Sequence, residues 1–375
     1  MPNYSIGITG LQVAQAALEL VGTNISNAAT DGYHRQDLKI APLHLNSAGG
    51  LAVGSGAQVL DVMRRMDVLL EEELVRLNPQ WAEADQQLTT LQGIEGALGD
   101  LDSEGLAKSI GDFYAGLNEL AANPESRAYQ EQALWAATAM CSDFRNMSQF
   151  LTDLQENLLL EAQNTCLEIN GLTAEIASLN SKIHKVHARG GNTNVLLDRR
   201  DQAIYEVSEL LEIETQGRLS GDGVVGLNAW GMPLVSGHNS FPMEAAVTND
   251  GKLGVALENA AYYTTRTGGG RLGGLMALRN EVIPGLLEKL DKLSKYIILE
   301  TNRIHSQGVG TYGSFSELSG WAVSDQAFED WTEDVQDGSV FVRVIDSNGD
   351  ASRTEINIAT TDTLTDVKNQ FDAVA

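Results

Sequence analysis

Gly10–Gln36 reads GLQVAQAALELVGTNISNAATDGYHRQ and combines an apolar helix pattern with a polar stop. Apolar side chains recur at Leu11, Leu18 and Ile25, and smaller apolar residues stand between them. The intermediate residues are Ala14, Val21 and Ala28. This alternation of three and four residues is typical of a helix that packs against a partner helix. The stretch therefore predicts a helix whose apolar row requires another helix to cover it.

The polar stop is built from residues that end helices. Asn24, Ser26 and Asn27 have short side chains that can bond back to nearby backbone groups. Gly32 permits a turn with a positive φ, which would hold the ring of Tyr33 at a fixed place. We therefore expect the helix to end here in a defined turn.

The string NISNAATDGY, from Asn24 to Tyr33, resembles the N-terminal signature of the bacterial flagellar rod, hook and hook-associated proteins. Their common form is Asn-Ile-(Ala or Ser)-Asn-x-x-Thr-x-Gly-(Tyr or Phe). The resemblance implies a role in subunit assembly for the residues of the row and the stop. These residues are Leu11, Ala14, Leu18, Val21, Asn24, Ile25, Asn27, Gly32 and Tyr33.

The composition argues against several classes of protein. The chain has 375 residues and a net charge of -26, from 25 basic and 51 acidic residues, so nucleic acid and anionic membranes would be repelled. No apolar run is long enough to span a bilayer, and the N-terminus lacks the pattern of a cleaved signal peptide. Cys141 and Cys166 fall in one expected helix, too far apart for a disulfide or a shared metal. We therefore expect no membrane or nucleic-acid partner.

The remaining pattern predicts an α+β fold with long heptad-patterned helices in an elongated, rod-like bundle. A Gly/Ser-rich joint at 47–56 and a short extended segment are expected before residue 67. Helices are expected over 67–98, 104–121 and 126–188, and a returning helix within 268–310 is expected to end near Gly308. Heptad rows mark two of them, with few breaks. The first row is Ile169, Leu172, Ile176, Leu179, Ile183 and Val186, and the second is Leu286, Leu290, Leu293, Ile297 and Ile304.

Five regions follow from these patterns. They are an assembly helix and turn (1–45), a helical shaft (46–212), a small inserted antiparallel sheet (213–267), the returning shaft helix (268–310) and an acidic β-rich domain (311–375). After residue 313 there are 13 acidic and 3 basic residues. A hairpin is expected from Val340 to Ile358, with its turn at Asp346–Asp350. The chain is expected to stop inside a helix that begins near Thr363, which predicts an incomplete last domain.

Two internal stretches narrow the resemblance. Asn194–Ile213 is similar to a segment of the flagellar hook-associated protein 1 family, the first hook–filament junction proteins. Its Asp198 and Asp201, beside Arg199 and Arg200, are expected to pin a loop to a helix start, while Val207, Leu210 and Leu211 are buried. Residues 270–308 are similar to a glycine-rich start, long helix and Asn-x-x-His-x-x-Gly exit of that family. The family motif residues are Leu197, Asp198, Arg200, Asp201, Gly273, Gly274, Asn302, His305 and Gly308.

The resemblance implies a non-enzymatic structural subunit with no cofactor and no metal. Implied partners are copies of itself in a ring, the hook protein, the second junction protein, the flagellin filament and an export chaperone. Implied localisation is the extracellular flagellum, reached by the flagellar type III route. The N-terminal helix would pair with a C-terminal heptad helix, which residues 311–375 do not supply, so we expect a truncated chain.

Three alternatives remain open at this stage. The first is another flagellar rod or hook protein, and the second is an exported adhesin or hydrolase on a flagellar stem. The third is a soluble enzyme that binds a dinucleotide at Gly268–Gly273, which reads GGGRLG and satisfies G-x-G-x-x-G. No buried second strand follows at the distance that a dinucleotide fold requires, so the default interpretation is a flexible glycine-rich start of a helix. His184 and His187 have metal-ligand spacing, but two lysines flank them and a solvated face is expected.

Overall fold

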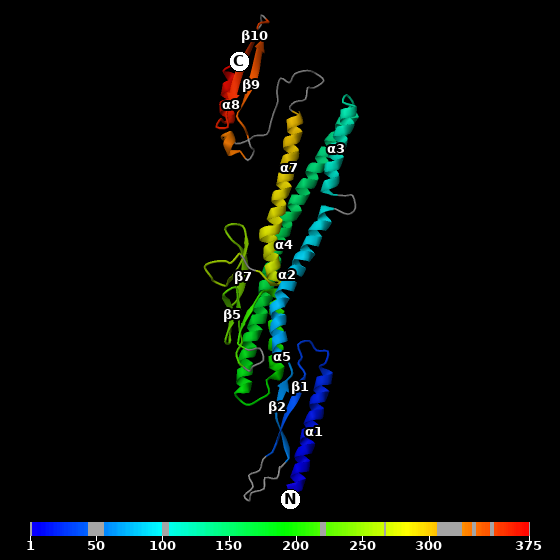
Figure 1. Ribbon diagram of the computed structural model, residues 1–375, viewed down its shortest axis with the longest axis vertical. Helices are drawn as coiled ribbons and strands as arrows, with labels where there is room; N and C mark the ends of the chain where they lie inside the picture. Colours follow the sequence, from blue (N-terminus) through cyan, green and yellow to red (C-terminus); the bar gives the residue numbers. More distant parts are fainter. Residues whose placement is uncertain are drawn as a thin grey trace. The chain divides into compact units, whose positions relative to one another are not determined.

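The fold is described from a computed structural model (Figure 1). It describes residues 2–43, 56–99, 105–217, 223–265, 268–305, 325–331, 335–345 and 349–374. The chain divides into two compact units, Met1–Ser306 and Gln307–Ala375. Long helices dominate the first unit, and all sheets are small and antiparallel. The predicted α+β class is confirmed.

The first unit begins with helix α1 (Pro2–Ser26) and a two-stranded hairpin. Strand β1 (Gln36–Pro42) pairs antiparallel with β2 (Ala57–Arg64), and Gln36 stands opposite Arg64 at the base. Both strands contact α1 (Figure 1). Only a short extended segment was expected before residue 67, so the hairpin is a correction: β1 lacks a regular alternation of apolar residues. The expected joint at 47–56 lies almost wholly outside the described residues.

The predicted helices are confirmed within a residue or two at most ends. They are α2 (Val68–Leu98), α3 (Leu106–Ala122) and α4 (Arg127–His187). The side chain of Asp67 caps the start of α2 by accepting from the amides of Leu69 and Leu70. Gly99 ends α2 with φ 70°, a left-handed conformation that suits glycine. Local capping therefore sets the ends that the sequence indicated.

Helix α4 organises the first unit. One half lies beside α3, and the other half carries α5 (Asn194–Leu210) and small sheets (Figure 1). The predicted α4 row is largely buried, with Ile169, Ile176 and Ile183 at 0% exposure. It packs against helix α5, which the chain forms after it turns back at Gly190–Gly191, and it shares its core with the strands as well.

The returning helix is interrupted at its start. It consists of α6 (Gly270–Ala277), a π-helical turn (Leu278–Val282) and α7 (Ile283–His305). In its apolar row Leu290 and Ile297 are buried, whereas Leu293 and Ile304 are 42% and 62% exposed. Among the described residues, the part of α7 beyond Leu290 therefore packs mainly through every second member of the row.

The inserted region forms two antiparallel sheets against α4. One sheet has the order β3 (Glu214–Gln216), β4 (Gly226–Ala229), β5 (Met232–Ser236) and β6 (Asn239–Ser240). The other pairs β7 (Met243–Val247) with β8 (Leu253–Leu257). The β-favouring stretch Tyr262–Thr265 forms a single bridge, from Thr264 to Val255. The prediction of a small antiparallel sheet structure in this region is confirmed.

The second unit contains the expected hairpin, β9 (Gly338–Ile345) paired with β10 (Ala351–Ile358). A 3-10 turn (Phe328–Asp330) and helix α8 (Leu364–Asp372) complete its described part. Thr363 and Asp366 form a capping box at the start of α8. Helix α8 ends at Asp372. Part of the hairpin turn, 346–348, lies outside the described residues.

The two cysteines of α4 should differ sharply in reactivity. Cys141 is exposed, whereas Cys166 is 1% exposed and burial raises the pKa of its thiol to about 12. Because the thiolate is the nucleophile, iodoacetamide at mildly alkaline pH should label one thiol in the native chain. Intact-mass spectrometry would show a second label only after urea is added. Two labels in the native chain would contradict the buried position of Cys166.

Candidate functional site: a buried polar junction beneath the N-terminal helix

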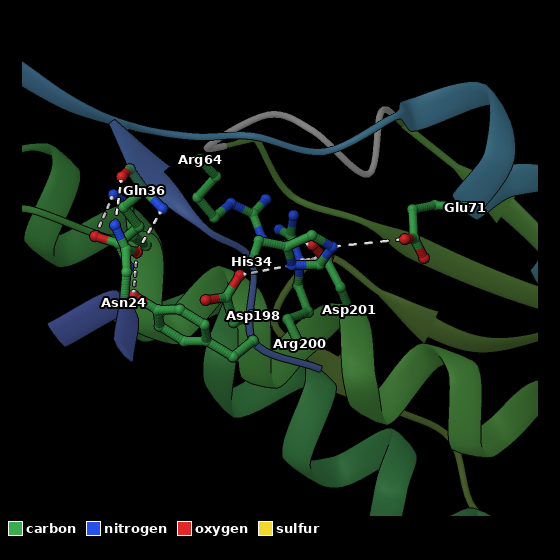
Figure 2. Close-up of polar contacts among 10 residues, drawn as sticks. Asn24, His34, Gln36, Arg64, Glu71, Asp198, Arg200 and Asp201 are labelled. Atoms are coloured by element: carbon green, nitrogen blue, oxygen red, sulfur yellow. Dashed lines mark hydrogen bonds and ion pairs between the residues drawn. The ribbon is translucent and has the colours of Figure 1, made fainter. Parts of the chain in front are cut away.

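Asn24 ties the end of α1 to the first residue of β1. Its amide nitrogen donates to the carbonyl oxygen of Gln36, and its side-chain oxygen accepts from the Gln36 amide, both at 2.9 Å (Figure 2). The hydroxyl of Tyr33 donates to the same side-chain oxygen at 2.9 Å. One side chain thus satisfies two backbone groups and one hydroxyl, which fixes where the chain leaves the helix.

The turn between Asn24 and Gln36 rests on α5. Gly32 has φ 73°, and a Cβ there would stand 2.6 Å from Oε1 of Gln202. A side chain at Gly32 would therefore be strained and crowded. Burial raises the pKa of Tyr33, and the nearby charge of Asp198 adds to it. Asn27 bonds back to the carbonyl oxygen of Thr23, as expected of a residue that ends a helix.

Arg64 connects the hairpin to α5. Its Nη1 donates to Oδ1 of Asp198 at 2.9 Å and to Oδ2 of Asp201 at 2.7 Å. The side chain of Arg64 is 4% exposed, and those of the two aspartates are 9% and 10% exposed. Asp198 and Asp201 stand three residues apart on α5, so both face the same guanidinium. The charges are compensated inside the protein rather than by water.

His34 joins the same network from the turn (Figure 2). Its Nδ1 lies 2.9 Å from Oδ1 of Asp198, and its Nε2 lies 3.6 Å from Oε1 of Glu71 at the start of α2. The hydrogen bond to Asp198 raises the pKa of His34, against the lowering effects of burial and of Arg64. Burial raises the pKa of Asp201, although Arg64 opposes that effect.

Asn194 and Arg200 complete the junction around α5. Asn194, at the start of the helix, donates to the carbonyl oxygen of Val62 at 2.7 Å. Arg200 is 0% exposed and donates to the carbonyl oxygen of Gly223 at 2.7 Å. Its Nε lies 3.8 Å from Oδ1 of Asp201. The network thus reaches from the N-terminal turn to the loop before β4.

This geometry corrects the predicted roles of the charged residues. Asp198 and Asp201 do not pin a loop to the start of α5; they hold Arg64 and His34, which belong to the N-terminal segment. Arg199 points to Glu175 on α4 instead, with Nε and Oε1 2.6 Å apart. The predicted burial of Val207, Leu210 and Leu211 is confirmed. Leu197 is also buried, in the small core between α4 and α5.

The glycine string at Gly268–Gly273 is a packing device. A Cβ on Gly270 would stand 2.3 Å from the backbone nitrogen of Leu211, and one on Gly274 would stand 3.0 Å from the carbonyl oxygen of Glu83. Gly273 likewise approaches the backbone of Gly268. The glycines let α6 approach α2 and α5 closely. This close helix packing explains the spacing of the glycines without a dinucleotide site.

The other nominated residues lie apart from the junction. Leu11, Leu18, Val21 and Ile25 are 72%, 74%, 51% and 71% exposed, and Ala14 is exposed too. Asn302 and His305 are exposed at the end of α7. Gly308 lies outside the described residues. The nominated residues therefore fall into four places: the α1 row, the junction, the α6 contact and the end of α7.

Among the described residues, no three His, Cys, Asp or Glu side chains are grouped so that they could hold a metal ion. No helix in that part combines the length and apolar character needed to cross a membrane. His184 lies near His238, with ring centroids 5.8 Å apart.

The sequence prediction missed His34, Arg64, Glu71 and Asn194. The available signal was the pair Asp198 and Asp201, which share one face of a helix that also buries Leu197. Two carboxylates on a buried face require cations. Arg64 lies at the end of β2, and the hairpin that brings it to α5 was not expected from the sequence.

The stability contributed by His34 should depend on pH. Its pKa is raised above the ordinary 6.5, so protonated His34 stabilises the fold below that pH. The contribution is lost as pH rises through the higher pKa of the folded state. The difference in free energy of unfolding between wild type and His34→Gln should therefore shrink between pH 5.5 and 8.5, as measured by urea titration. A difference that grows with pH would show that neutral His34 makes the stronger contact.

Comparison with known proteins gives one consistent result. Residues 91–317, more than half of the chain, match the family model of the flagellar hook-associated protein FlgK helical domain. The chain is 29% identical over 259 residues to flagellar hook-associated protein 1 of Bacillus subtilis strain 168, covering 67% of this chain and 49% of that protein. It is 26% identical over 320 residues to the Salmonella typhimurium LT2 protein of the same name, covering 82% and 57%.

Among solved structures, the chain is similar to the flagellar hook junction protein FlgK from Burkholderia pseudomallei. Its TM-score is 0.48 at 24% identity, and the match covers 55% of this chain and 38% of that one. The chain spans about half the length of the curated relatives that it matches. On the evidence of the family model and these relatives, the chain belongs to the flagellar hook-associated protein 1 (FlgK) family.

Proposed function

We propose that this chain is a structural subunit of the bacterial flagellum that joins the hook to the filament through helix–helix assembly. The observation that carries the proposal is the exposed apolar row of α1, held at one end by a buried polar junction. Family membership supports a flagellar junction role over a rod or hook protein. The proposed function requires no catalysed reaction.

The row requires a partner to become stable. Leu11, Leu18 and Ile25 are more than 70% exposed, and isolated amphipathic helices are marginal in water. Gly7, Gly10 and Gly22 lie within α1 with nothing near their Cβ positions, and each costs about 1 kcal/mol relative to alanine. A helix of this kind gains stability when another apolar row covers it. We therefore expect α1 to be ordered chiefly by assembly.

The junction gives the row a defined direction. Asn24 ties the end of α1 to the start of β1. His34 ties the turn, and Arg64 ties the hairpin, to α5, which shares its core with α4. An assembly helix must present its row at a fixed angle, because a misdirected row cannot pack into a ring of identical neighbours. In this proposal the buried charges of the junction orient α1, and its exposed apolar row contacts the neighbouring subunit.

The proposed partners are other copies of the chain, the hook protein, the second junction protein, flagellin and an export chaperone. The proposed location is the extracellular flagellum. We assign assembly to the α1 row and its turn, and a rigid, elongated shaft to the helices of 46–212 and 268–310. The acidic region 311–375 would remain solvated.

A strain of the source bacterium that lacks the gene tests the proposal. It should build hooks but release flagellin into the medium, and wild-type chain should restore filaments. Leu11→Glu with Leu18→Glu should fail to restore them, whereas Leu134→Glu, an equally exposed leucine on α4, should succeed. Electron microscopy and immunoblots of the medium read out both results. Normal filaments on the deletion strain would refute the proposed role.

A further inference from the structure

His34 lies between two carboxylates that belong to different helices (Figure 2). Its Nδ1 lies 2.9 Å from Oδ1 of Asp198 on α5, and its Nε2 lies 3.6 Å from Oε1 of Glu71 in the first turn of α2. His34 itself belongs to the turn that follows α1, and its side chain is 15% exposed. One ring therefore connects the N-terminal turn to α5 and to α2.

The two contacts are both attractive only when the ring carries two protons. A neutral imidazole has one N–H group and one lone pair, whereas the imidazolium has two N–H groups. With a carboxylate oxygen beside each nitrogen, a neutral ring must turn its lone pair toward one of the two oxygens, and that contact is repulsive. The arrangement therefore suits the imidazolium form of His34.

The charged groups around the ring favour the same form. They come from β2, α5 and α2, and the two arginines and three carboxylates among them leave one negative charge in excess. The groups are Arg64, Asp198, Arg200, Asp201 and Glu71. A protonated His34 makes this cluster neutral. The hydrogen bond to Asp198 acts in the same direction, because it raises the pKa of His34.

The two carboxylates differ in how firmly they hold the ring. The side chain of Asp198 is 9% exposed, and the oxygen that contacts His34 also accepts a hydrogen bond from Arg64. Glu71 lies farther from the ring, and its side chain is 33% exposed, so water can replace the histidine there. When the ring becomes neutral, the remaining proton therefore stays on Nδ1, toward Asp198, and the contact with Glu71 is lost.

We propose that His34 is a pH-sensitive switch that joins the N-terminal turn to the start of α2. Protonated His34 bridges Asp198 and Glu71. When Nε2 gives its proton to solvent, the neutral ring keeps its hydrogen bond to Asp198 but turns a lone pair toward Glu71, and the turn gains local freedom. The switch is a property of the isolated chain, so it holds or fails independently of the proposed junction function.

The tautomer of neutral His34 gives the sharpest test. In the full chain with isotope-labelled histidine, heteronuclear NMR distinguishes a ring nitrogen that carries a proton from one that carries a lone pair. Both nitrogens of His34 should be protonated at acidic pH, and Nε2 alone should lose its proton as the pH rises. His34→Gln assigns the signal among those of the six histidines. A neutral ring that carries its proton on Nε2 would overturn the proposal, because Asp198 would then be the lost contact.

Two glutamate variants of α2 test the release of the turn. Hydrogen exchange of residues 27–36, corrected for the intrinsic effect of pH, should speed up by about threefold or more between pH 5.5 and 8.5 in the wild-type chain. Glu71→Gln should abolish this increase, because an amide can accept from the protonated ring and donate to the neutral one. Glu72→Gln removes the same charge from an exposed neighbour and should retain it. An equal increase in Glu71→Gln, or none in the wild type, would overturn the proposal.

Discussion

Arg64→Met is expected to lower the free energy of unfolding of the first unit by about 3 to 5 kcal/mol. Arg64 is almost fully buried and compensates both Asp198 and Asp201 through one nitrogen. Methionine fills similar space but leaves two carboxylates buried without that cation, and burial of an unpaired charge is costly. Urea titration followed by far-ultraviolet circular dichroism measures the loss, because this unit contains most of the helix.

The ion pair between Arg199 of α5 and Glu175 of α4 supplies the control for Arg64→Met. Arg199 pairs with Glu175, but its side chain is 51% exposed, so Arg199→Met should cost less than about 1 kcal/mol. Adding Asp201→Asn to Arg64→Met should recover part of the loss, since one of the two uncompensated charges is removed. Equal effects of the two arginine substitutions would show that the junction does not depend on buried charge.

Gly270→Ala is expected to destabilise the same unit by about 2 to 4 kcal/mol. The added Cβ would lie 2.3 Å from the backbone nitrogen of Leu211, which cannot move aside as a flexible side chain can. Gly270 also has φ 70°, a conformation that costs alanine about 1 kcal/mol or more. The two costs add because one is strain within the residue and the other is a clash with α5.

Gly171→Ala is the control for this substitution. Gly171 lies inside α4, and its Cβ position has nothing within 4 Å. Alanine there should raise the free energy of unfolding by up to about 1 kcal/mol, because it favours the helix. Opposite signs for the two substitutions are expected in the same urea titration. If Gly270→Ala were neutral, α6 would not require its close approach to Leu211.

The helices were predictable because local chemistry fixes their ends. Asp67, Gly99 and Thr363 cap or end helices through groups within a few residues. The heptad spacing of the α4 row predicted that its residues are buried. The hairpin of β1 and β2 was not predictable in the same way. Its strands pair across a long connection, and most of their residues are exposed, so no apolar alternation marks them.

The junction illustrates the same limit at the level of the site. Asp198 and Asp201 were identified as important residues, yet their partners were assigned to neighbours in sequence. The actual partners, His34 and Arg64, are more than a hundred residues away, and nothing local selects them. Arg199 and Arg200 look equivalent in sequence, but one faces Glu175 near solvent and the other is fully buried. Only tertiary packing separates their roles.

The long separation within the junction has a consequence for the order of folding. His34 and Asp198 are 164 positions apart, and Arg64 and Asp198 are 134 apart. Contacts of such high sequence separation form only after the intervening chain has collapsed, since loop closure must come first. During vectorial synthesis the first helix therefore emerges early and stays unoriented until α5 has been made. Its direction is an outcome of folding, set after more than half of the chain exists.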